Sequence, residues 1–203
     1  MYHIFYLHGF KSQANSVKGT LLQRYCKTAY PHIQVHLPDL NFPPQLVIEQ
    51  IKKQIDAKYK REHICFVGSS LGGFYATYLA HHYDCSGVLI NPVIRPWQLF
   101  ETHIGLDQLP YEVTPNWSLT LKDIQSLKQY DTTDVPDLSK LLVLLQQGDA
   151  TLDYKATQDY YGERKISSMI MTECGGNHVM DNFAEKIPML LVFLLQYLSL
   201  RNI

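Results

Sequence analysis

The sequence predicts an α/β fold with a mostly parallel sheet of about six strands and helices on both faces. Two observations support this class, and a third indicates an insertion in it. Short apolar segments alternate with amphipathic ones, which is typical of βαβ units. The sequence Gly68-Ser69-Ser70-Leu71-Gly72 follows an apolar strand and precedes a helix. Nearly fifty residues, 92–139, break the alternation. We expect one domain, 1–203, with a cap-like insertion at about 92–139.

The strands are expected where short apolar runs end at turn-forming residues. They are predicted at 3–7, 33–37, 63–67, 87–90, 141–145 and 168–171. Pro38 ends the second of these runs, and Asn91-Pro92 ends the fourth.

The helices are expected where apolar residues recur at helical spacing. They are predicted at 17–30, 44–58, 74–80, 154–161 and 183–200. Ser16 suits the N-cap of the first helix, and Pro43-Pro44 opens the second. The apolar stripe of the second helix is predicted to consist of Leu46, Val47, Ile51 and Ile55.

The insertion is rich in proline, aromatic and polar residues, and two helices are predicted in it, at 96–103 and 119–130. Two interpretations stay open for it: a cap over an active site, or a long crossover connection. Its aromatic residues suit either the lining of an acyl pocket or the core of the insertion itself; they are Trp97, Phe100, Tyr111 and Trp117.

Composition and charge favour an ordinary globular protein. Apolar residues make up 46% and charged residues 18% of the chain, and the formal net charge is −1. This charge provides no attraction for nucleic acid or an anionic membrane surface, so neither partner is expected. No signal peptide is expected, and the apolar run 189–195 is interrupted by Gln196, so no membrane span is expected. Four scattered cysteines without a CxxC pair suggest reduced thiols and a cytoplasmic location.

Ser70 is the predicted nucleophile. In the pattern Gly-x-Ser-x-Gly between a strand and a helix, the serine occupies a tight turn that exposes its hydroxyl, and the flanking glycines avoid collisions with neighbouring segments. This turn is the nucleophile elbow of α/β-hydrolases, which makes the α/β-hydrolase fold the expected one.

A serine nucleophile needs a base and an orienting carboxylate, which hydrolases of this fold supply in the order Ser, Asp or Glu, His. His178 is the predicted base, because it follows Gly175-Gly176 between the last strand and the last helix. Asp149 is the favoured acid, directly after the fifth strand, and Asp153 is the alternative unless it caps the helix that follows. Cys174 is interpreted as a packing residue rather than a nucleophile.

The oxyanion hole needs two backbone N–H groups. The amide of Leu71, after the nucleophile, is the first candidate, and the amide of Phe10, in Leu7-His8-Gly9-Phe10 after the first strand, is the second. His8 is interpreted as a residue that braces this loop.

These segments together resemble the small bacterial YqiA-type esterases, a reduced branch of the α/β-hydrolase superfamily. The most specific matches are the elbow combined with Asn91-Pro92-x-x-Arg95-Pro96, with Gly148-Asp149-x-x-Leu152-Asp153-Tyr154, and with Gly175-Gly176-Asn177-His178. The resemblance implies an intracellular carboxylic ester hydrolase with the triad Ser70, Asp149 and His178. Met180 departs from the pattern, where an aromatic residue is expected.

We therefore expect serine-dependent hydrolysis of a small-molecule carboxylic ester through an acyl-enzyme, without a metal or organic cofactor. Two alternatives stay open: a thioesterase that uses the same triad on an acyl-CoA or another thioester, and a non-catalytic binding protein of hydrolase fold. Nothing in the sequence determines the acyl chain length or the oligomeric state.

Overall fold

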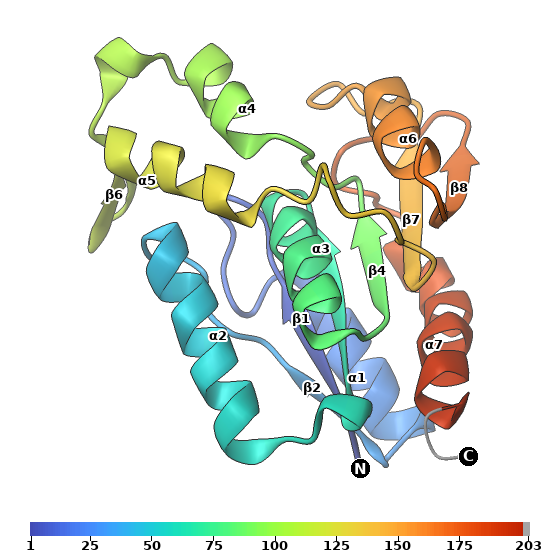
Figure 1. Cartoon of the computed structure of the whole chain (residues 1–203). Helices are drawn as coiled ribbons and strands as arrows, with labels where there is room; N and C mark the ends of the chain where they lie inside the picture. Colours follow the sequence, from blue (N-terminus) through green and yellow to red (C-terminus); the bar gives the residue numbers. More distant parts are fainter. Residues whose placement is uncertain (201–203) are drawn as a thin grey trace.

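A computed structural model describes residues 1–200, and its centre is one six-stranded sheet (Figure 1). The strands of this sheet are β1 (Tyr2–Leu7), β2 (Ile33–His36), β3 (Ile64–Ser69), β4 (Gly87–Ile90), β7 (Leu141–Gln146) and β8 (Met169–Glu173). They lie in the order β2-β1-β3-β4-β7-β8, and every neighbouring pair is parallel. The predicted α/β class and the parallel sheet are therefore confirmed.

Helices cover both faces of the sheet and connect its strands. They are α1 (Val17–Ala29), α2 (Pro44–Lys58), α3 (Leu71–Tyr83), α6 (Tyr154–Gly162) and α7 (Phe183–Leu200). Helices α1 and α7 pack on one face, with Leu22 and Leu190 in their apolar cluster. Helices α2, α3 and α6 pack on the other face, where Ile51, Leu79 and Tyr161 belong to a second cluster. The alternating side chains of each strand supply both clusters, which is why the central strands are apolar along most of their length.

Of two local predictions about the helices, the first holds for the position alone and the second was wrong. Ser16 stands at the N-cap of α1, but its hydroxyl makes no capping hydrogen bond. Leu46 is exposed, whereas Ile48 is buried with Val47, Ile51 and Ile55, so the buried stripe of α2 is rotated from the predicted one.

The segment between β4 and β7 differs most from the prediction. Helix α4 (Pro96–His103) was predicted correctly, but a hairpin of β5 (Tyr111–Thr114) and β6 (Trp117–Leu119) was missed. The second predicted helix is reduced to α5 (Leu121–Ser126) and a 3₁₀ turn at Leu127–Tyr130. A capping box between Thr120 and Asp123 starts α5 only after the hairpin has ended.

The insertion packs against the body of the protein. Phe100, Leu119, Ile124 and Leu127 are buried in the same apolar cluster as α2 and α3. In Figure 1, α4 and α5 lie above α2 and α3, beyond the carboxyl ends of the central strands. Among the helices within residues 1–200, none combines the length and the hydropathy that a membrane crossing requires.

Gly72 permits the contact between α3 and β1 on which the elbow depends. A Cβ atom at this position would lie 2.0 Å from the carbonyl oxygen of Leu7, a backbone atom that moves only with its strand. We expect Gly72→Ala to lower the free energy of unfolding by more than about 3 kcal/mol, or to prevent folding.

Gly162→Ala is the matched control, because its new Cβ would lie 3.5 Å from Ile170 Cδ1, an ordinary contact. Its free energy of unfolding should change by less than about 1 kcal/mol in urea titrations. Equal unfolding midpoints for the two variants would show that α3 and β1 do not require this approach.

His36 makes the stability of the fold depend on pH. Burial, with the nearby positive charges of His3 and Lys58, lowers the pKa of His36 to about 4. The unfolded chain therefore binds more protons than the native protein between the ordinary histidine pKa and this value. The free energy of unfolding should fall as pH is lowered from about 6.5 to 4, by about 1 kcal/mol for this half-buried group.

The variant His36→Gln tests whether His36 causes this pH dependence. Calorimetric unfolding at several pH values should give a smaller loss of stability over this interval than in the wild type. An unchanged loss would assign the acid sensitivity to other groups.

Candidate active site

The candidate nucleophile lies in a strained turn between β3 and α3. Ser70 has φ of 54° and ψ of −119°, a backbone conformation that a side-chain-bearing residue adopts only when its surroundings impose it. The surroundings do so on both sides: the Ser70 amide donates to Ile90 O at 3.0 Å, and the Ser70 carbonyl accepts from the amide of Gly73 at 2.9 Å. The turn therefore has the geometry predicted for a nucleophile elbow.

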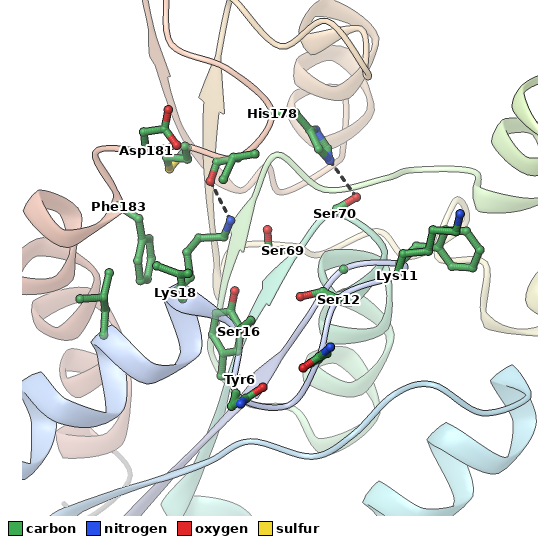
Figure 2. Close-up of a pocket in the computed structure, with 18 residues that line it drawn as sticks. Tyr6, Lys11, Ser12, Ser16, Lys18, Ser69, Ser70, His178, Asp181 and Phe183 are labelled. Atoms are coloured by element: carbon green, nitrogen blue, oxygen red, sulfur yellow. Dashed lines mark hydrogen bonds between the residues drawn. The ribbon is translucent and has the colours of Figure 1, made fainter. Parts of the chain in front are cut away.

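Ser70, His178 and Asp149 form one continuous hydrogen-bonded chain. His178 Nε2 lies 3.0 Å from Ser70 Oγ, and Nδ1 of the same ring lies 2.7 Å from Asp149 Oδ2. Figure 2 shows the imidazole of His178 facing the hydroxyl of Ser70 at one end of a cavity. The structure thus brings together three residues that are up to 108 positions apart in the sequence.

The environment of Asp149 favours its ionised form. Burial alone would raise the pKa of this carboxyl, since its side chain is only 2% exposed. Hydrogen bonds from His178 and from the amides of Leu152 and Thr151 outweigh burial, and the pKa lies below its ordinary value. An ionised carboxylate only accepts hydrogen bonds, so the proton of His178 resides on Nδ1, and Nε2 is left to accept from the hydroxyl of Ser70.

Asp153, the alternative acid, has a different position. Its Oδ1 accepts from the amides of Lys155 and Ala156, which caps the first turn of α6. The structure therefore places Asp149, and not Asp153, beside the imidazole.

The two candidate oxyanion amides lie on segments that meet at Ser70. Leu71 is the first residue of α3, where the amides point out of the helix without an intrahelical acceptor. Phe10 follows Gly9, whose missing side chain lets the loop approach closely: a Cβ on Gly9 would lie 3.2 Å from Ser70 Cβ. Within residues 1–200, neither amide donates a hydrogen bond, so both are available to an oxyanion.

His8 holds the loop that carries Phe10. Its Nε2 accepts from the amide of Leu40 at 3.0 Å, and its Nδ1 lies 2.9 Å from Gly9 O. The ring is 2% exposed and has no contact with Ser70 among these hydrogen bonds. The predicted bracing role therefore agrees with its contacts.

Two cavities of different character open on either side of Ser70. One, of about 350 Å³, is mainly apolar and lies under the insertion; besides Ser70 and His178 its wall includes Phe10, Leu71, Val93, Leu99, Phe100, Ile104 and Tyr111. The other, of about 550 Å³, is more polar and lies between the loop after β1 and the loop of His178 (Figure 2). Lys18, Ser12 and Ser16 lie in its wall, and Lys18 Nζ donates to Val179 O at 2.7 Å.

The aromatic residues of the insertion divide between lining and core. Phe100 and Tyr111 line the apolar cavity, and both rings contact Phe10. Trp97 instead packs on Phe74 in the core. Phe100 and Tyr111 therefore line a cavity beside Ser70, whereas Trp97 belongs to the core, and the acyl pocket itself stays a prediction.

The sequence interpretation missed two buried polar residues that support the site, Asn91 and Gln146. Asn91 was interpreted as the end of a strand and as part of the family match Asn91-Pro92-x-x-Arg95-Pro96, and no role at the site was predicted for it, although an asparagine directly before a proline at a strand end was a usable signal. Gln146 ends an otherwise apolar strand, and its Oε1 accepts from the amide of Asn177, the residue before His178.

Cys174 does not pack as predicted. Its side chain is exposed at the end of β8, whereas Cys26, Cys65 and Cys85 are buried. The strand ends at the preceding residue, and Cys174 starts the loop toward His178, which leaves it outside both apolar clusters. Within residues 1–200, no group of three or more histidine, cysteine, aspartate or glutamate side chains is arranged to hold a metal ion.

Comparisons with solved structures identify the fold. The chain is similar to Est1E from Butyrivibrio proteoclasticus, solved with bound ferulic acid, with a TM-score of 0.69 and 15% identity over 97% of this chain and 90% of that one. It is also similar to mouse alpha/beta hydrolase domain-containing protein 10, with a TM-score of 0.70 and 14% identity over 97% and 90% of the two chains. An esterase/lipase from an uncultured bacterium gives a TM-score of 0.62 and 15% identity over 98% and 77%.

At this level of identity the similarity establishes the fold alone, and it confirms the predicted α/β-hydrolase fold. The family comparison is more specific. The model of an uncharacterised protein family, UPF0227, which is the YqiA family, matches residues 3–195. This match covers nearly the whole chain and agrees with the resemblance that the sequence motifs indicated. The protein belongs to the UPF0227 family.

Proposed function

We propose that the protein hydrolyses carboxylic esters through an acyl-enzyme formed on Ser70. The observation that carries the proposal is the unbroken series of hydrogen bonds from Ser70 Oγ through the ring of His178 to Asp149. A serine hydroxyl is a weak nucleophile at neutral pH, and this arrangement provides both a proton acceptor and a fixed tautomer for that acceptor.

In the first half of the reaction, Ser70 Oγ attacks the ester carbonyl carbon while its proton passes to His178 Nε2. The carbonyl oxygen gains negative charge and accepts hydrogen bonds from the amides of Phe10 and Leu71. The buried Asp149 carboxylate stabilises the imidazolium, which then gives its proton to the leaving alkoxide as the bond from carbon to that oxygen breaks.

In the second half, water attacks the acyl-enzyme and transfers a proton to His178 Nε2. The bond from the acyl carbon to Ser70 Oγ breaks, and His178 returns the proton to the serine. The products are a carboxylic acid and an alcohol, and the steps use only groups of this chain and water.

The two cavities suggest how a substrate is divided around the reacting carbonyl. The apolar cavity suits a hydrocarbon or aromatic part of a small-molecule ester, and the polar one suits a part that forms hydrogen bonds. Because Phe100 and Tyr111 come from the insertion, we propose that residues 92–139 act as a cap over the active site. We propose that the cap and the rest of the chain form a single domain. Thioester hydrolysis would use the same groups and stays an alternative.

Ser70→Ala tests the nucleophile. Removing the hydroxyl leaves binding and the candidate oxyanion hole in place but allows no acyl-enzyme, so kcat/KM on a nitrophenyl acyl ester should fall by at least ~10³-fold. Thermal unfolding of the variant serves as the control for folding. Turnover retained by the folded variant would disprove the proposal, because a different group would then be the nucleophile or the reaction would take place elsewhere.

Asp149→Asn and Asp153→Asn form a matched pair that tests the acid. An amide at 149 can donate to Nδ1 and so favours the wrong tautomer of His178, which should lower kcat by about 10³–10⁴-fold. Asparagine at 153 still caps α6, so kcat there should stay within about twofold of wild type. Steady-state kinetics on both variants decide the assignment, and the reverse order of losses would make Asp153 the acid.

A further inference from the structure

Asn91 occupies the point at which the segments carrying all three triad residues meet. It is the first residue after β4, which lies between β3, the strand of the elbow, and β7, the strand before Asp149. Its backbone amide donates to Leu144 O on β7, while the carbonyl of the preceding Ile90 accepts from the amide of Ser70. The backbone of this junction is thereby tied to both neighbouring strands.

The side chain of Asn91 connects two further segments. Its Oδ1 accepts from the amide of Gln146, the last residue of β7, at 3.0 Å. Its Nδ2 donates to Asn177 O at 3.1 Å and to His178 O at 3.2 Å, the carbonyl of the candidate base itself. The amide group therefore uses both of its donors and its acceptor at once, inside a site where Asn91 is 2% exposed.

The backbone at this position favours asparagine, aspartate or glycine, and the side-chain hydrogen bonds select asparagine among them. Asn91 has φ of 39°, in the left-handed region that asparagine tolerates better than most residues with a side chain. Aspartate would tolerate this backbone but would place an oxygen about 3 Å from two carbonyl oxygens. Glycine would relieve the backbone but would leave Gln146 N, Asn177 O and His178 O without this partner.

The loop before His178 has little conformational preference of its own. Gly175 and Gly176 both have positive φ, of 69° and 73°, in a region open to glycine at no steric cost. The position of the loop must therefore come from contacts with other segments. The amide of Gly148 donates to Gly175 O at 2.7 Å in the middle of the loop, and the Asn91 amide provides two contacts directly beside the candidate base.

We propose that Asn91 is a positioning residue, which holds His178 at hydrogen-bonding distance from Ser70 without contacting the substrate. The inference rests on the proposed function. Among the described residues that line the two cavities beside Ser70, Asn91 is absent, so its effect on the reaction passes through the loop of His178. A displacement of the imidazole weakens proton transfer from Ser70 and leaves the binding surfaces intact.

The test uses Asn91→Gly, which keeps the backbone conformation, and Asn91→Asp, which keeps the shape but loses the two donors. For both, kcat on a nitrophenyl ester should fall by about 10–100-fold while KM stays within about threefold. The rate at which a fluorophosphonate labels Ser70 should fall in proportion. Asn91→Asp should be the slower of the two, because its carboxylate repels the carbonyls of Asn177 and His178.

A destabilised control separates positioning from a general loss of structure. Ile55→Val removes a buried methyl group in the last turn of α2, whose C-cap Tyr59 packs on His3 at the start of β1. Measured well below its unfolding midpoint, this variant should keep kcat and labelling rate within about twofold of wild type. If folded Asn91→Gly keeps full kcat and full labelling while the wild-type activity still depends on Ser70, the positioning role is overturned and the proposed function stands. If the wild-type activity does not depend on Ser70, the proposed function itself is refuted.

A measurement on the wild type keeps the inference testable if neither Asn91 variant folds. The two side-chain amide protons of Asn91 should exchange with solvent much more slowly in NMR spectra than those of Asn116, which lies at the exposed turn between β5 and β6. Exchange of the Asn91 protons as fast as those of Asn116 would show that the bonds to Asn177 and His178 are not maintained in solution.

Discussion

The parallel pairing of β3, β4, β7 and β8 is the constraint on which the candidate site depends. In a parallel sheet every strand ends at the same edge, so the turns that follow β3, β7 and β8 gather there, with only the end of β4 between β3 and β7, although their residues are far apart in sequence. Ser70, Asp149 and His178 occupy these three turns. The register of each pair, such as Gly68 opposite Leu89, fixes how far each strand extends toward the site.

Two different kinds of contact fix the positions of Ser70 and His178 at this common edge. The elbow is held by close packing: α3 crosses β1 with no space for a side chain at Gly72, and the strained backbone of Ser70 is fixed between two hydrogen bonds. The loop of His178 is held by buried polar contacts, through the amides of Asn91 and Gln146. Packing thus fixes the candidate nucleophile, and hydrogen bonds fix the candidate base.

The parts of the structure that sequence patterns predict are those with a strong local signal. Alternating segments and the glycine-flanked Ser70 were sufficient for the fold class, which is confirmed, and for the strand and helix order around the site. His178 and Asp149 were found because the order of the triad restricts where they can lie, and their catalytic roles stay a prediction.

The parts that were missed depend on tertiary contacts. The β5–β6 hairpin has strands too short for a clear period, and its burial against the body of the protein decides its structure. The choice of Ile48 over Leu46 depends on the rotation of α2 against the sheet. Asn91 has no periodic signal at all, because its importance comes from partners 55 to 87 residues away.

The most direct test of the account is to trap the reaction of the wild-type protein with a nitrophenyl ester by rapid acid quenching, followed by peptide mass spectrometry. The account predicts a burst of nitrophenol and an acyl group covalently bound to the peptide that contains Ser70. An acyl group found only on another residue would contradict it.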